Sequence, residues 1–228
     1  RLLSGAWLAP QLKMQSSPYD TLLLVEDDAQ LLDDLLSAQQ QPALGFADAS
    51  PMRPALQVLP LALTQLWQPV DIFGLVAFLT HGLCPIRGLA RSRLATKIAG
   101  QPGIDRTHLT ETFNAIRKEV DDQNRERPDQ LIDADALVRE AEIWLFGARY
   151  RPDAGAPISD VIQRVNRIAE FFRKRLGLKS ADSTIGLSEG AAFQQCVALL
   201  DGLGQLTAQG ESLIQPRVLQ KLVRQASS

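Results

Sequence analysis

The stretch ISDVIQRVNRIAEFFRKRL, residues 158–176, shows the pattern that most of this chain follows. Its apolar residues recur every three or four positions, a spacing that places them along one side of an α-helix. The residues on that side are Val161, Val165, Ile168, Ala169, Phe172 and Leu176. The spacing predicts an amphipathic helix over residues 158–176 that packs its apolar side against other helices.

The same periodicity continues on both sides of this stretch, and proline or glycine separates the segments. It predicts further helices over residues 53–67, 71–81, 88–99, 105–121, 133–150, 188–209 and 215–225. Eight helices with short connections predict an all-α body over residues 51–228. Residues 123–130 are polar and contain Pro128, so we expect an exposed linker there, with residues 151–157 as a second candidate.

The first 50 residues have a different pattern. Residues 19–26, YDTLLLVE, form a short apolar run typical of a buried strand. Asp27 or Asp28 can begin a helix with leucines at 31, 32, 35 and 36, and residues 43–46 can form a second short strand. The sequence therefore predicts a mainly α fold with a small strand-helix-strand piece in domain 1–50 and a helical domain over 51–228.

Composition narrows the possible functions. The chain has 228 residues, of which 45% are hydrophobic, and a formal net charge of -2. This composition is typical of a folded globular chain, and contact with nucleic acid would need a local basic patch. Isolated Cys84 and Cys196 predict buried, reduced thiols and a cytoplasmic protein, and no apolar run is long enough to predict a membrane span. Because the chain begins at Arg1, we expect it to belong to a longer protein.

The sequence contains no motif for catalysis that we can identify. It has no Gly-x-x-x-x-Gly-Lys-Ser/Thr loop to hold nucleotide phosphates and no Gly-x-Ser-x-Gly elbow. His81 and His108 do not have the spacing of metal ligands, and His81 is better interpreted as a group at the end of a helix. We therefore expect no catalytic residue, no metal and no cofactor in this chain.

One alternative begins at residues 24–28, LVEDD, followed by a leucine-rich helix. This run resembles the opening of a response-regulator receiver domain, which implies a magnesium site at Asp27 and Asp28 and a phosphoacceptor at Asp71. Asp71, however, precedes an apolar stretch whose length suits a helix, and alternating strands and helices are absent after Phe46. The receiver-like domain stays an alternative.

The order of elements from residue 18 to about residue 86 resembles the second motor half of UvrD-like superfamily 1 helicases and of their degenerate relatives in AddB-type helicase–nuclease proteins. The resemblance rests on the strand at residues 19–25, the leucines of the next helix, the Leu44-Gly45-Phe46 strand and the helical pair beginning at residue 53. Glu26 stands where active motors have an arginine, which implies an inactive nucleotide site. The nuclease signature of the PD-(D/E)XK family is also missing.

The resemblance implies a non-catalytic scaffold region of a DNA repair and recombination helicase–nuclease. Such a region guides DNA or contacts other domains and subunits, while the longer parent protein is an exonuclease or helicase-type enzyme. A purely structural helical module for protein interaction is the remaining alternative.

The helix over residues 158–176 also holds the candidate DNA contacts. Its basic residues gather within an arc of about 100° around the helix, beside one aromatic ring. These candidates are Arg164, Arg167, Phe171, Lys174 and Arg175. We expect this exposed face to follow a phosphate backbone and to stack a base. A second basic stretch, with Arg87, Arg91, Arg93 and Lys97, spreads more widely around its helix.

Overall fold

The computed structural model describes residues 38, 54–177 and 184–227. The chain divides into two units, Arg1–Ser50 and Pro51–Ser228, and nearly all described residues belong to the second. The strand-helix-strand piece predicted in the first 50 residues, with Glu26, Asp27 and Asp28, lies outside the described residues.

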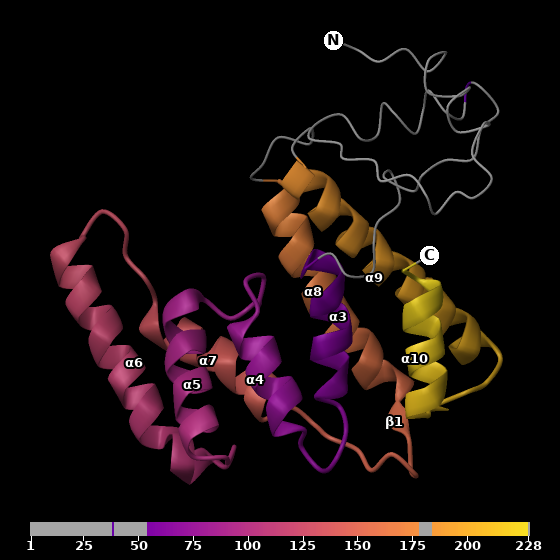
Figure 1. The fold of residues 1–228 in the computed structure, drawn as a ribbon, viewed down its shortest axis with the longest axis horizontal. Helices are drawn as coiled ribbons and strands as arrows, with labels where there is room; N and C mark the ends of the chain where they lie inside the picture. The colour runs from indigo at the N-terminus through magenta and orange to yellow at the C-terminus, as the bar shows by residue number, and fades with distance from the viewer. Residues whose placement is uncertain (1–37, 39–53, 178–183, 228) are drawn as a thin grey trace, which may run out of the picture. The chain divides into compact units, whose positions relative to one another are not determined.

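The second unit is helical, as predicted (Figure 1). Its described residues form eight helices, all at sites where the sequence predicts one. They are α3 (Pro54–Thr64), α4 (Ile72–Thr80), α5 (Gly88–Gly100), α6 (Arg106–Glu126), α7 (Ala134–Leu145), α8 (Ile158–Leu176), α9 (Thr184–Ala208) and α10 (Pro216–Gln225). The mainly α fold class is therefore confirmed for this unit.

Three of these helices begin behind an aspartate that caps them. Asp71, Asp105 and Asp133 each accept a hydrogen bond from the backbone N–H three residues later, at 2.8–2.9 Å. The side chain thereby satisfies one of the backbone donors that the first turn of a helix leaves unpaired. Asp71 is thus the cap of α4 and does not end a buried strand, as a receiver phosphoacceptor would.

Three predicted boundaries are wrong by four residues or more, one of them the start of α9, which begins at Thr184 instead of residue 188. Helix α6 continues to Glu126, so the polar run at residues 123–130 is linker only in its second half. Helix α7 ends at Leu145, where the sequence predicts helix as far as residue 150. The chain leaves α7 early because the backbone of Tyr150 donates to Leu66 O at 2.7 Å and accepts from Gln68 N at 2.9 Å, which an α-helix at this point would prevent.

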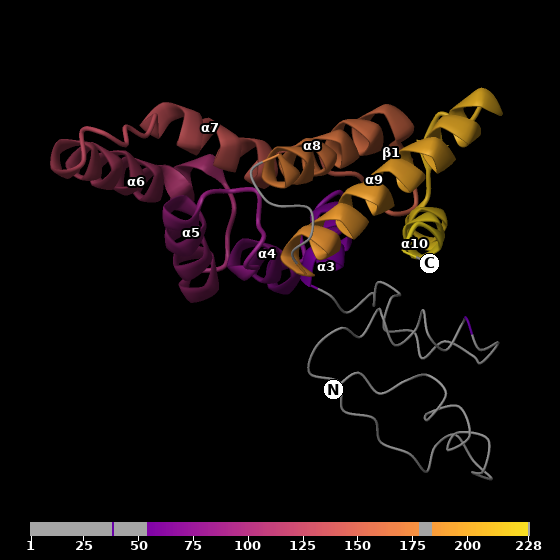
Figure 2. The ribbon, with the colours of Figure 1, turned by 90° about the horizontal axis from the view of Figure 1, so that it is seen from above.

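The helices pack as two groups joined through α3 and α4 (Figures 1 and 2). Helices α3, α8, α9 and α10 form one group, and α4 to α7 form the other. Buried aromatic rings hold the second group together, with Phe78 of α4 and Trp144 of α7 5.3 Å apart between centroids. Cys84 and Cys196 are both buried, as predicted.

A small antiparallel ribbon, which the sequence does not predict, lies at the start of α8 and of α10. Strand β1 (Ala156–Pro157) pairs with β2 (Leu213–Ile214), with Ala156 opposite Ile214. Two residues per strand are too few for alternation to be recognised in the sequence. In the part of the chain that the structure describes, no helix combines the length and the hydropathy needed to cross a membrane.

Candidate functional site

The predicted basic face of α8 is only partly exposed. The sequence places Arg164 on the exposed face, but this residue is 8% exposed and belongs to the buried side of the helix. Its long apolar stem follows the core while its guanidinium reaches the neighbouring helices. The prediction of one continuous exposed face is therefore wrong at Arg164.

Two more of the predicted contacts take part in helix packing. Arg175 forms an ion pair with Glu189 of α9 at 2.7 Å, and the Glu189 side chain is fully buried. The Arg175 guanidinium also lies 5.5 Å from the centroid of Phe171. Phe171 in turn contacts Phe172 edge-on at 5.2 Å. Arg175 therefore links α8 to α9, and Phe171 packs against Arg175 and Phe172 within α8.

Lys174 and Arg167 remain exposed. Lys174 lies 3.6 Å from Glu170, which also pairs with Arg173 at 2.7 Å. Such exposed pairs contribute roughly 0–1 kcal/mol, so they leave Lys174 available to a ligand. Arg167 makes no hydrogen bond or ion pair with any residue that the structure describes, and it lines a cavity.

This cavity, which we call the arginine pocket, has a volume of about 440 Å³ and lies beside α6, α7 and α8. Four guanidinium groups and two carboxylates line it, giving a formal charge of 4 − 2 = +2. The charged residues are Arg106, Arg139, Arg164, Arg167, Glu142 and Asp160. The apolar part of its lining comes from Leu66, Ile143, Trp144 and Phe146.

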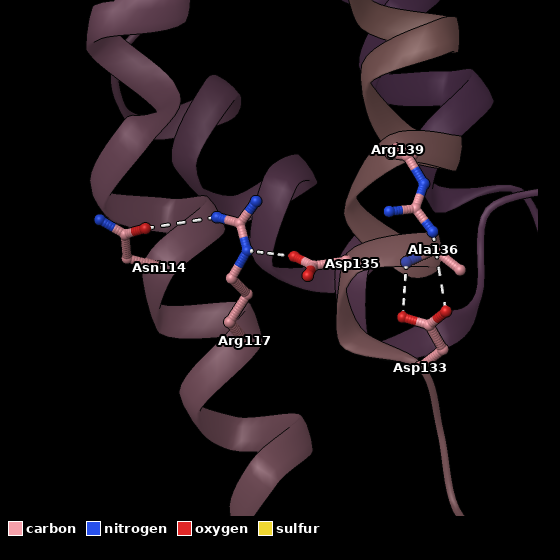
Figure 3. A network of polar contacts seen from close by, with 6 residues as sticks. All are labelled: Asn114, Arg117, Asp133, Asp135, Ala136 and Arg139. Carbon is pink, nitrogen blue, oxygen red and sulfur yellow. Dashed lines mark hydrogen bonds and ion pairs between the residues drawn. The ribbon is translucent and has the colours of Figure 1, made fainter.

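Residues at the two ends of α7 hold two of these arginines. Arg106 pairs with Glu142 at 2.9 Å and stacks over Phe146 at 4.5 Å. Arg139 lies 3.6 Å from Asp133, the cap of α7 (Figure 3). Alongside this pair, Arg117 of α6 bonds Asp135 of α7 at 2.9 Å.

Arg164 is the most enclosed charge of the pocket. Its Nη1 donates to the Ala62 carbonyl of α3 at 3.3 Å, and its guanidinium lies 5.9 Å from the Trp144 centroid. Burial, together with the charge of Arg149, lowers the pKa of Arg164 to about 10. The group is still protonated at neutral pH.

Arg164 also lacks a direct counterion. Its Nε and Nη2 donate to no residue of the described chain. Asp160 also lines the pocket, but its Oδ2 accepts from the Tyr150 hydroxyl and its Oδ1 from Ser159 at 3.1 Å. Burial and the hydrogen bond to Asp160 raise the pKa of Tyr150 to about 12, so the phenol keeps its proton and remains the donor. The two donors are not among the buried side-chain atoms without a partner, and Arg164 lines the pocket, so an anionic ligand there can accept from them.

The sequence identifies only half of the arginines in the pocket. Arg164 and Arg167 are among the predicted residues, whereas Arg106 and Arg139 lie on other helices and no spacing in the sequence relates them to α8. In the second basic stretch, Arg93 and Lys97 line another pocket together with Glu111 and Glu119, while Arg91 lies apart at the end of α4. Arg91 donates to the His81 carbonyl at 2.6 Å, and Arg93 pairs with Glu119 at 2.8 Å.

Within residues 54–177 and 184–227, no three His, Cys, Asp or Glu side chains lie close enough to hold a metal ion. The chain matches no family model, no curated protein and no solved structure.

Proposed function

We propose that this chain is a non-catalytic scaffold region of a DNA-processing helicase–nuclease assembly, which guides DNA by binding its phosphates in the arginine pocket. The observation that carries the proposal is the pocket itself, with its net charge of +2 and the unpaired donors of Arg164. Guanidinium groups suit phosphate because their planar donors can bond two oxygens at once.

The surroundings of the pocket also support this function. Arg167 and Lys174 are exposed on α8 and extend the positive charge from the pocket along the helix. Contacts of this kind bind the phosphate backbone without reading the base sequence. The proposed activity is therefore sequence-independent binding that weakens as salt displaces the arginine–phosphate contacts.

Fluorescence anisotropy with labelled single-stranded and partly duplex DNA tests the proposal. We expect binding at low salt that falls steeply as salt increases, with no ATP hydrolysis and no DNA cleavage by this chain. Arg139→Ala and Arg167→Ala should each weaken binding and reduce the slope of log K against log salt by about 0.7 for single strands, the effect of one lost phosphate contact.

Arg217→Ala is the matched control, because Arg217 is exposed on α10 and does not line the pocket. It should leave both affinity and slope nearly unchanged. Absence of DNA binding at low salt would contradict the proposal. A chain carrying Arg167→Glu and Lys174→Glu that binds DNA normally, but no longer assembles with a helicase–nuclease partner, would assign these residues to subunit assembly instead.

A further inference from the structure

The deepest donors of the arginine pocket are hard for an internal phosphate to reach. Arg164 is only 8% exposed, and a Cβ on Gly147 would lie 2.7 Å from its Nη2, so the guanidinium is closely covered on that side. An internal phosphodiester carries the strand onward on two sides. A terminal phosphate carries it on one side only and can enter a cavity end-on.

The charge of the pocket points the same way. An internal phosphodiester brings one negative charge, whereas a terminal phosphomonoester brings about 1.5 to 2 at pH 7. The formal charge of +2 from four arginines and two carboxylates matches the second of these. Because Arg106 already pairs with Glu142, the cations facing the ligand are Arg139, Arg164 and Arg167. Asp160 keeps its negative charge, since its partner Tyr150 is neutral, and the exposed contact of Arg139 with Asp133 at 3.6 Å is weak.

The size of the pocket leaves room for more than a phosphate. A volume of about 440 Å³ lies within the range of small-molecule sites, roughly 300–1,000 Å³. Beside the arginines lie apolar side chains, of which Ile143 is 41% exposed. Ile143 and the half-buried Phe146 can contact the sugar and base attached to a terminal phosphate, whereas Leu66 and Trp144 are buried.

We infer that the arginine pocket binds the terminal phosphate of a nucleic-acid strand in preference to its internal phosphodiesters. This inference rests on the proposed function, since it takes the anion to be part of a nucleic-acid strand. Arg164 holds the inner oxygens of the phosphate, Arg167 and Arg139 hold the outer oxygens, and the terminal nucleotide lies against the apolar lining.

Competition anisotropy with three oligonucleotides of one sequence tests the inference. One strand carries a 5′-phosphate, one a 3′-phosphate, and one has hydroxyl groups at both ends. We expect at least one phosphorylated strand to bind at least tenfold more tightly than the hydroxyl-ended strand. Comparing the affinities of the 5′- and 3′-phosphorylated strands then identifies the end that the pocket binds.

Two variants assign this preference to the pocket. Arg164→Gln should reduce it to within twofold, and because Arg164 belongs to the binding site the variant should also bind the hydroxyl-ended strand more weakly, so the preference is measured as the ratio of the two affinities within each variant. Because Arg164 also contributes to the core, the exposed Arg167→Gln serves as a second variant that leaves packing intact, and it should reduce the preference in part. Arg217→Gln, outside the pocket, should keep the full preference.

The outcomes separate the two proposals. Equal affinity of the wild-type chain for all three strands overturns the terminal-phosphate inference but leaves the proposed function standing. A preference that persists in both Arg164→Gln and Arg167→Gln also overturns the inference. No binding of any strand at low salt contradicts the proposed function itself.

Discussion

At the scale of single residues, Gly147 decides how closely Arg164 can approach the backbone after α7. A Cβ at this position would lie 2.7 Å from Arg164 Nη2 and 2.8 Å from the Ile143 carbonyl oxygen. Because the second contact is with backbone, an alanine forces a local shift. We expect Gly147→Ala to lower the free energy of unfolding by about 1–3 kcal/mol, measured by urea denaturation. It should also weaken DNA binding, because Arg164 is displaced.

Gly204→Ala gives the matched control for this change. Gly204 lies within α9, and a Cβ there would meet no atom within 4 Å. In a helix, alanine is more favourable than glycine by roughly 0.5–1 kcal/mol, so this variant should be slightly more stable than the wild type. A Gly147→Ala chain as stable as Gly204→Ala would contradict the close packing of Arg164.

At the scale of helices, Asp133 has two roles, because it caps α7 and also contacts Arg139 of the arginine pocket. Asp133 accepts from the Ala136 backbone N–H at 2.9 Å and lies 3.6 Å from Arg139 (Figure 3). Asp133→Ala removes both contacts and should destabilise the chain by about 1 kcal/mol. Asp133→Asn keeps an oxygen that can cap the helix and loses only the exposed ion pair, so its cost should be well under half of that. Thermal unfolding of the two variants measures the difference, and equal losses would assign the effect to the ion pair instead of the cap.

The positions of the helices could be predicted from the sequence, but some of their ends could not. Apolar periodicity locates all eight described helices because each has buried apolar residues at three- or four-residue spacing. It misplaces the end of α6. The polar run at residues 123–130 predicts a linker, but the exposed end of a helix can also consist of polar residues. There, the Asn124 side-chain amide donates to the Ile132 carbonyl and accepts from the Ile132 N–H, both at 2.8 Å, and these bonds hold the chain that leads to α7.

At the scale of the whole molecule, the arginine pocket shows why a site is harder to predict than a fold. Arg164 and Arg167 share a helix face and can be found from their spacing. Arg106 and Arg139 join them only in the folded chain, where α6 packs against α7 and residues of both helices line the pocket with α8. The chain between α7 and α8 is held by backbone bonds of Tyr150 to Leu66 and Gln68, a contact between distant residues that periodicity does not encode.

The two buried thiols test whether the helix groups fold as one unit. Cys84 belongs to the α4–α7 group and Cys196 to the other, and burial raises their pKa values to about 11 and about 12. In the unfolded chain a thiol has a pKa of about 8.5. The thiols of the unfolded chain therefore lose their protons at a lower pH than the buried thiols of the folded chain. The free energy of unfolding is unaffected by the thiols below about pH 8.5 and falls as the pH rises from there toward 11.

Urea unfolding at pH 7.5 and pH 9.5 measures this loss. We expect about 1 kcal/mol for each thiol, within a single transition, because Arg164 and Trp144 join the two groups. Cys84→Ala and Cys196→Ala should each halve the pH-dependent loss, and comparing each variant with itself at the two pH values cancels the cost of its cavity. Two transitions, each shifted by only one of the cysteines, would show that the groups unfold separately. A double variant that loses as much stability as the wild type would instead assign the pH dependence to other groups.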